Sequence, residues 1–97
     1  MDMAAFIDSI ESGALDKSLP KLLQAMWFDA RGDWNRAHEI AQEDESAKGA
    51  LVHAYLHRKE GDLGNARYWY SRAGVPQCRG NLSEEWQDLV NKLLAGE

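Results

Sequence analysis

The chain has 97 residues, of which 44% are hydrophobic and 28% are charged, and its formal net charge is −5. This size fits one domain, and the composition is ordinary for a soluble globular protein. An acidic chain is a poor candidate for sequence-independent DNA binding, because that binding depends on neutralising phosphates. No apolar run approaches the roughly 20 residues needed to cross a bilayer, so neither a nucleic-acid nor a membrane partner is expected.

The N-terminal sequence and the cysteine content predict the compartment. The first residues, Met1 to Asp8, are acidic and lack the basic start of a secretion signal. The single cysteine, Cys78, has no partner for an internal disulfide. Both features favour a reducing compartment, and we therefore expect a cytoplasmic protein.

Charge is distributed unevenly along the chain. Residues 1–45 carry ten acidic and four basic side chains, residues 46–80 carry two and six, and residues 81–97 carry four and one. The basic middle segment could hold an anion or an acidic peptide. It could instead complement the acidic ends, either within the fold or in a homodimer, and exposed charge pairs by themselves indicate little.

Helix signals run the whole length, and strand signals are absent. The apolar stripe of residues 6–10 predicts a first helix that ends at Gly13 in a left-handed cap. Ser18 is a good N-cap for a second helix, with Pro20 tolerated in the first turn. Gly32 is expected to end that helix.

The same signals continue to the end of the chain. Asp33 is expected to cap a third helix, and Ser46 a fourth helix that ends at Gly61. Asp62 is expected to cap a fifth helix, which Gly74 closes. Ser83 is expected to begin a final amphipathic helix.

Two stretches of the chain repeat one pattern. Residues 25–37 and 54–66 each begin with alanine, carry Gly-Asp seven residues later and end with alanine five residues after the glycine. The repeat unit of 29 residues runs from Gly32 to Gly61. A fixed period in this range is typical of stacked helical hairpins. The sequence therefore predicts four central helices as two hairpins, flanked by one helix at each end.

This pattern resembles the tetratricopeptide (TPR) repeat and its Sel1-type relatives. The matching residues are Ala25, Gly32, Asp33, Trp34 and Ala37 in the first unit, and Ala54, Gly61, Asp62, Ala66, Tyr70 and Ala73 in the second. The second unit is also similar to a small set of bacterial TPR-like proteins, a similarity that implies a fold and no particular activity. The resemblance implies an all-α fold in which residues 1–97 form a single TPR-like domain with capping helices at both ends.

The pattern departs from the family in three ways. The period is shorter than the usual 34 residues, and two repeats are fewer than the three or more that usually form a stable array. Gln24 and His53 stand where a core leucine is expected, and His57 stands where an aromatic residue is expected. The end helices must therefore supply the capping.

Two histidines form the first candidate site. His53 and His57 lie at i and i+4 on one helix, a spacing that places two imidazoles on a metal in the HExxH motif. The glutamate of that motif is absent, Glu60 lies three residues beyond, and a third ligand such as His38 would have to come from another helix. No metal or other cofactor is therefore predicted. The favoured interpretation is partly buried histidines that donate to a carboxylate or carbonyl across the hairpin, with ligand contact as the alternative.

Three consecutive aromatic residues form the second unusual feature. Tyr68, Trp69 and Tyr70 span about 200° of a helix, so they cannot all face one core. Tyr70 takes the buried position of the repeat. Tyr68 or Trp69 is then available for a partner or a dimer contact, although packing against the C-terminal helix is the simplest structural interpretation.

These features favour a TPR-like adaptor that binds a protein or peptide through its second hairpin. The candidate binding residues combine hydrogen-bonding groups, cations and rings: His53, His57, Arg58, Asn65, Tyr68, Trp69 and Arg72. Aromatic and arginine side chains usually carry interface energy. The alternative is a protein that binds a small carboxylate or phosphate through a His/Arg cluster. An enzyme is a more remote alternative, since the sequence contains no nucleophile motif and no phosphate-binding glycine loop.

Overall fold

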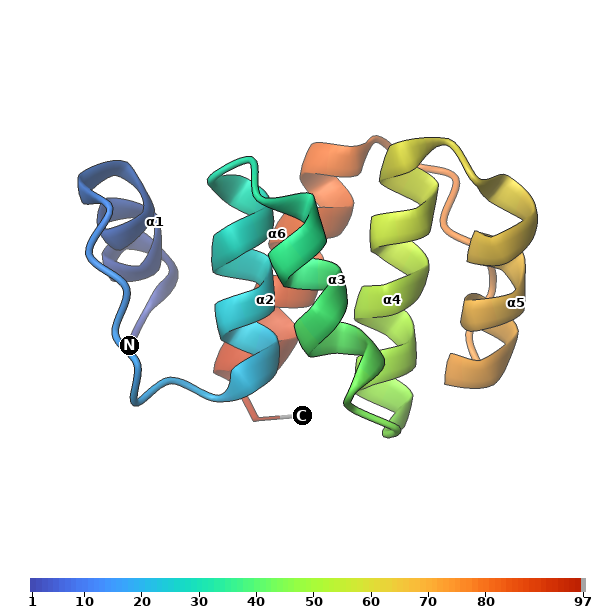
Figure 1. Cartoon of the computed structure of the whole chain (residues 1–97), viewed down its shortest axis with the longest axis horizontal. Coiled ribbons are helices and arrows are strands. Elements are labelled where there is room, and N and C mark those ends of the chain that lie inside the picture. Colours follow the sequence, from blue (N-terminus) through green and yellow to red (C-terminus); the bar gives the residue numbers. More distant parts are fainter. Residues whose placement is uncertain (97) are drawn as a thin grey trace.

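The structure is a computed structural model of the chain and describes residues 1–96 (Figure 1). Its elements are α1 (Met3–Ser12), α2 (Lys21–Ala30), α3 (Trp34–Gln42), α4 (Ala47–Glu60), α5 (Leu63–Ala73) and α6 (Leu82–Leu94). No strand occurs in the described range, so the prediction of an all-α fold is confirmed. None of the helices described has the length and apolarity needed to cross a membrane.

The central helices pack in chain order. Helix α2 packs against α3, α3 against α4, and α4 most extensively against α5, so that the four lie side by side (Figure 1). Helix α6 returns across this row and contacts α1, α2 and α4. The C-terminal helix thereby ties the two helix pairs together, and the molecule extends 34 Å along its longest axis.

The repeated Gly-Asp residues form the two tightest turns. Gly32 and Gly61 adopt positive φ angles of 86° and 91°, a conformation that costs a side-chain-bearing residue energy. The carboxylates of Asp33 and Asp62 accept hydrogen bonds from free backbone N–H groups at the starts of α3 and α5. The cap of α3 follows Gly32 directly. Only residues 31–33 therefore join α2 to α3.

Two predicted helix starts are wrong. Helix α2 begins after Pro20, because proline disfavours the helical conformation in the residue that precedes it. Ser18 instead binds the Asp16 carboxylate through both its hydroxyl and its N–H. Helix α6 begins two residues early, because Asn81 caps it by accepting from the N–H of Glu84.

Small residues bring the central helices together. The four repeat alanines, Ala25, Ala37, Ala54 and Ala66, are fully buried, as expected for positions of close helix approach. Most buried residues form one core among α1, α2, α3, α4 and α6. A second, smaller core of Ala54, Ala66 and Tyr70 joins α4 to α5.

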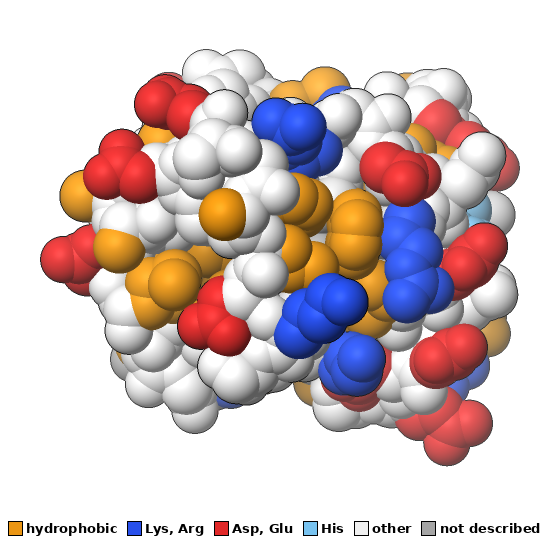
Figure 2. All heavy atoms as spheres, turned by 60° about the vertical axis from the view of Figure 1, so that its left-hand side comes forward, with side chains coloured by type: hydrophobic (Ala, Val, Ile, Leu, Met, Phe, Trp, Pro, Cys, Tyr) orange, Lys and Arg blue, Asp and Glu red, His pale blue; other side chains and the backbone are white. Residues whose placement is uncertain are grey.

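Helix α1 is held to the rest of the chain by a few specific contacts. The ring of Phe6 lies 6.1 Å from that of Trp86, and the Trp27 indole donates to the Ser9 hydroxyl. Arg31 donates to the carbonyl of Ile10 and also lies over the Trp27 ring. Figure 2 shows hydrophobic side chains on this side of the molecule with lysine and arginine side chains beside them.

Candidate functional site

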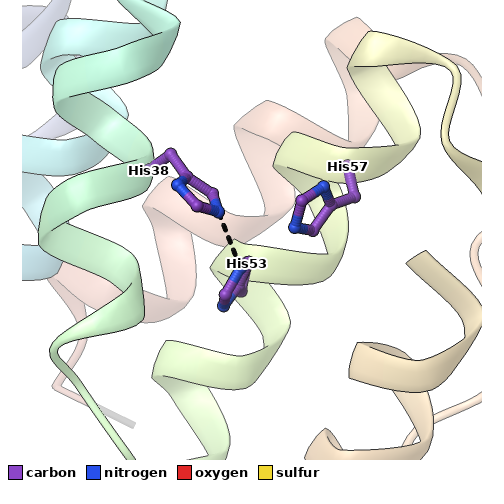
Figure 3. Close-up of side chains that lie close together, drawn as sticks. All are labelled: His38, His53 and His57. Atoms are coloured by element: carbon purple, nitrogen blue, oxygen red, sulfur yellow. Dashed lines mark hydrogen bonds between the residues drawn. The ribbon is translucent and has the colours of Figure 1, made fainter. Parts of the chain in front are cut away.

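All three histidines of the chain meet between α3 and α4. His38 lies on α3, and His53 and His57 lie one turn apart on α4 (Figure 3). The Nε2 atoms of His38 and His53 are 2.9 Å apart. One ring nitrogen from each histidine lies within 4.8 Å of the other two. The structure therefore places His38, which the sequence offered as a third ligand from another helix, beside the predicted pair.

Trp34 fixes the register of α3 on α4, and so places His38. Its indole N–H donates to the carbonyl of Leu56 at 2.8 Å, and its ring stacks on the His38 imidazole with an interplanar angle of 9°. Residues at i and i+4 share a helix face, so Trp34 and His38 both face α4. This spacing is visible in the sequence and puts Trp34 and His38 on one face, but it does not show that His53 lies opposite.

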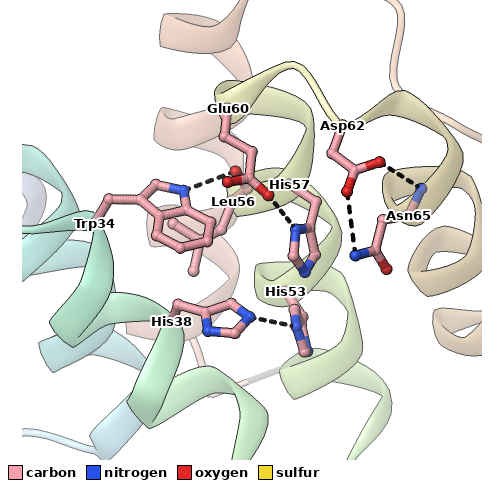
Figure 4. A network of polar contacts seen from close by, with 8 residues as sticks. All are labelled: Trp34, His38, His53, Leu56, His57, Glu60, Asp62 and Asn65. Atoms are coloured by element: carbon pink, nitrogen blue, oxygen red, sulfur yellow. Dashed lines mark hydrogen bonds and ion pairs between the residues drawn. The ribbon is translucent and has the colours of Figure 1, made fainter.

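The two histidines on α4 are buried and held from both sides. Their exposed fractions are 5% for His53 and 6% for His57. The Nδ1 atom of His57 lies 2.7 Å from Glu60 Oε1 (Figure 4), so its N–H donates to this carboxylate. Trp69 of α5 stacks on His53 at a centroid distance of 3.9 Å. The predicted carboxylate partner is therefore present, but it comes from α4 itself and not from across the helix pair.

The environment favours the uncharged forms of His38 and His53. Burial, followed by repulsion from His38 and His57, lowers the pKa of His53 to about 4. Burial and the nearby His57 also lower the pKa of His38. At neutral pH both imidazoles are then neutral, and the contact between their Nε2 atoms requires one ring to donate and the other to accept.

Arg58 does not join the histidines. One residue along a helix turns a side chain by about 100°, which directs Arg58 away from the face of His57. Its Nη1 atom donates to Glu85 Oε1 on α6 at 2.7 Å, and its Nη2 atom contacts the carbonyl of Gly80. Glu85 also accepts from the Tyr70 hydroxyl. The structure therefore does not bring the Arg58 guanidinium together with the histidines.

The remaining predicted residues lie on α5. Asn65 sits at its start beside Asp62, at 3.4 Å between Nδ2 and Oδ2 (Figure 4). Tyr68 is exposed, and Arg72 donates to its hydroxyl at 2.9 Å. Trp69 is half-buried against His53 and the small core of α4 and α5, so the interpretation that it packs on the C-terminal helix is wrong. Trp69, His53 and Arg72 are among the residues that line a pocket of about 280 Å³.

A second polar cluster was not expected from the sequence. Asp29 is 2% exposed and accepts from the Tyr55 hydroxyl at 2.7 Å and from Lys59 Nζ at 2.8 Å. It borders a cleft of about 420 Å³ among α1, α2, α4 and α6. Both carboxylate oxygens are occupied by side chains of α4, so the cluster acts as a tie between α2 and α4.

Comparisons of the chain with models of protein families, with curated proteins and with solved structures find no match. The resemblance to the TPR repeat therefore stays a prediction from the sequence. Two arrangements remain from which a function can be argued: the three facing imidazoles between α3 and α4, and the aromatic and arginine side chains on α5.

Proposed function

We propose that the chain is a TPR-like adaptor domain that binds a carboxylate-bearing segment of another protein. The observation that carries this proposal is the arrangement on α5, where the Arg72 guanidinium lies 5.8 Å from the Tyr68 ring and 5.6 Å from the Trp69 ring. Rings and an arginine held together on a surface supply both apolar contact and carboxylate recognition. The aromatic and arginine side chains form the binding face, which we call the α5 face: Tyr68, Trp69 and Arg72.

The distribution of ion pairs supports a carboxylate partner. Residues 46–80 contain six basic side chains, of which Arg58 and Lys59 are paired with carboxylates of α6 and α2. Arg67, Arg72 and Arg79 are exposed and make no ion pair within residues 1–96. Ion pairs within the described residues therefore neutralise only part of the positive charge of residues 46–80. Three arginines at this end of the molecule are available to a partner.

The corresponding region of α2 and α3 is committed to internal contacts. Arg36 lies 5.7 Å from the Phe28 ring, but it also pairs with Glu39 at 3.2 Å. Asp29 of α2 is buried. Solenoid proteins bind partners on an extended concave surface, and here α6 packs across α2 and α4. These contacts favour α5 as the surface that is free to bind a partner.

The test is affinity capture from a lysate of the source cells, followed by binding measurements with the purified partner. Arg72→Ala and Tyr68→Ala should each weaken binding by about tenfold or more, the loss typical of central interface residues. Arg36→Ala is the matched control, because Arg36 is also exposed and also lies over a ring. The proposal fails if no protein is captured, or if Arg36→Ala weakens binding and the two α5 variants do not. Cytoplasmic fractionation would test the location that the single Cys78 favours.

A further inference from the structure

We propose that His38, His53 and His57 form a binding site for one divalent transition-metal ion of the zinc class, each through its Nε2 atom. The imidazoles come from two helices, and Figure 3 shows the rings facing one another across the space between α3 and α4. Imidazole nitrogen suits zinc, copper and nickel, and a set of three histidines is an established zinc donor set. This site adjoins the α5 face, because Trp69 stacks on His53, but the inference does not rest on the proposed partner binding.

The distances suit a metal with little rearrangement. Zinc–nitrogen bonds of about 2.0–2.1 Å in a tetrahedral site place the donor atoms roughly 3.3 Å apart. The Nε2 atoms of His38 and His53 are 2.9 Å apart, and the donor atoms of all three residues lie within 4.8 Å. These distances are close to the spacing that a tetrahedral ion requires, and rotation of the imidazole rings is the movement that would bring the three nitrogens into bonding range.

The contacts around the three histidines orient their rings, as outer contacts of metal ligands do. Glu60 accepts the Nδ1 proton of His57, which leaves Nε2 with a free lone pair and directs it toward the other two rings. A carboxylate that orients a histidine in this way is the usual outer contact of a metal ligand. Stacking of Trp34 on His38 and of Trp69 on His53 limits the rotation of the remaining two rings.

Three histidine ligands would leave the fourth position of a tetrahedral metal site free. Three protein ligands with an open fourth position distinguish reactive zinc sites from closed structural ones. His38 is only partly buried, whereas His53 and His57 are buried, so an ion reaches the site past His38. An ion bound here would join α3 to α4 and stabilise the folded chain according to its affinity.

The experiment is calorimetric titration of the full-length, chelator-treated protein with Zn²⁺, and absorption spectroscopy with Co²⁺. We expect one ion per chain and visible Co²⁺ absorption of a four-coordinate, nitrogen-ligated site. His38→Gln should weaken Zn²⁺ binding by about 100-fold, since it removes one of three ligands. Glu60→Gln should weaken it by about tenfold, the usual effect of losing an outer contact.

A matched variant controls for charge. Glu39→Gln removes an exposed carboxylate from α3, next to His38, without touching the three rings. It should bind Zn²⁺ as the wild type does, and circular dichroism should show that every variant is folded. The proposal is overturned if the wild type takes up no Zn²⁺, if His38→Gln binds as tightly as the wild type, or if Glu39→Gln and Glu60→Gln lose affinity equally.

Discussion

The indole of Trp69 lies nearly parallel to the imidazole of His53, with 3.9 Å between ring centroids and 17° between planes. This contact joins α5 to the histidine cluster, so these two members of the predicted binding surface are direct neighbours. It also fixes which aromatic side chain of α5 faces inward. Trp69 belongs both to the α5 face and to the wall of the candidate metal site.

The orientation of α5 predicts unequal effects at adjacent positions. Trp69→Ala should lower the free energy of unfolding by about 1–3 kcal/mol, because it removes a half-buried ring from His53 and the small core. Tyr68→Ala should change it by about 0.5 kcal/mol or less, because Tyr68 is 52% exposed. Urea unfolding measures both values, and equal losses would contradict the orientation of α5.

The close approach of α4 and α5 predicts a cost for a larger side chain at Ala66. This residue is fully buried against Ala54 and Tyr70, so Ala66→Leu should destabilise the chain by about 1–3 kcal/mol through overpacking. Arg67→Leu is an exposed control on the same helix and should change the unfolding midpoint little. An unchanged midpoint for Ala66→Leu would contradict the packing described.

Two glycines within helices predict opposite effects of the same substitution. A Cβ atom on Gly49 would lie 2.2 Å from the backbone carbonyl oxygen of Asp44, so Gly49→Ala should destabilise by about 2–4 kcal/mol. A Cβ atom on Gly64 would meet no atom within 4 Å, so Gly64→Ala should stabilise by about 0.4–1 kcal/mol. Thermal unfolding of the two variants tests the direction of both changes in stability. A Gly49→Ala variant as stable as the wild type would contradict the close packing of Gly49 against Asp44 at the start of α4.

Tyr70 predicts a loss of stability in alkali. Burial and the hydrogen bond to Glu85 raise the pKa of Tyr70, with Arg58 and Cys78 also facing its hydroxyl. In the unfolded chain the phenol ionises at about pH 10, so above that pH the unfolded state binds fewer protons and stability falls as pH rises. The stability advantage of the wild type over Tyr70→Phe should therefore shrink by about 1 kcal/mol between about pH 9 and pH 11.

Urea unfolding of both proteins across this range measures the effect. The comparison cancels the ionisation of groups that the two chains share. A difference that stays constant with pH would contradict the buried hydrogen bond between Tyr70 and Glu85.

Local chemistry explains what the sequence could predict. The Gly-Asp turns at Gly32 and Gly61 need a positive φ angle and a capping carboxylate, and both requirements are visible in adjacent residues. The buried alanines follow from their place in the repeat. The start of α2 was predictable as well, because the restriction that Pro20 imposes on the preceding residue is local.

Contacts between helices explain what the sequence could not predict. Asp29 is buried because Tyr55 and Lys59, nearly one repeat later, provide its hydrogen bonds. Arg58 is directed to Glu85, which lies on a helix outside the repeat. His38 becomes part of a site only once α3 packs on α4. Periodicity identifies the face of a helix but does not identify the residue that will lie opposite.

The convergence of His38, His53 and His57 on one ion is tested most directly by diffraction from crystals grown with Zn²⁺, with anomalous data collected at the zinc absorption edge. We predict one strong anomalous peak between α3 and α4, bonded to the Nε2 atoms of all three histidines at about 2.0–2.1 Å. A zinc-containing crystal in which this position has no peak, and in which His38 and His53 keep their direct contact, would contradict the account.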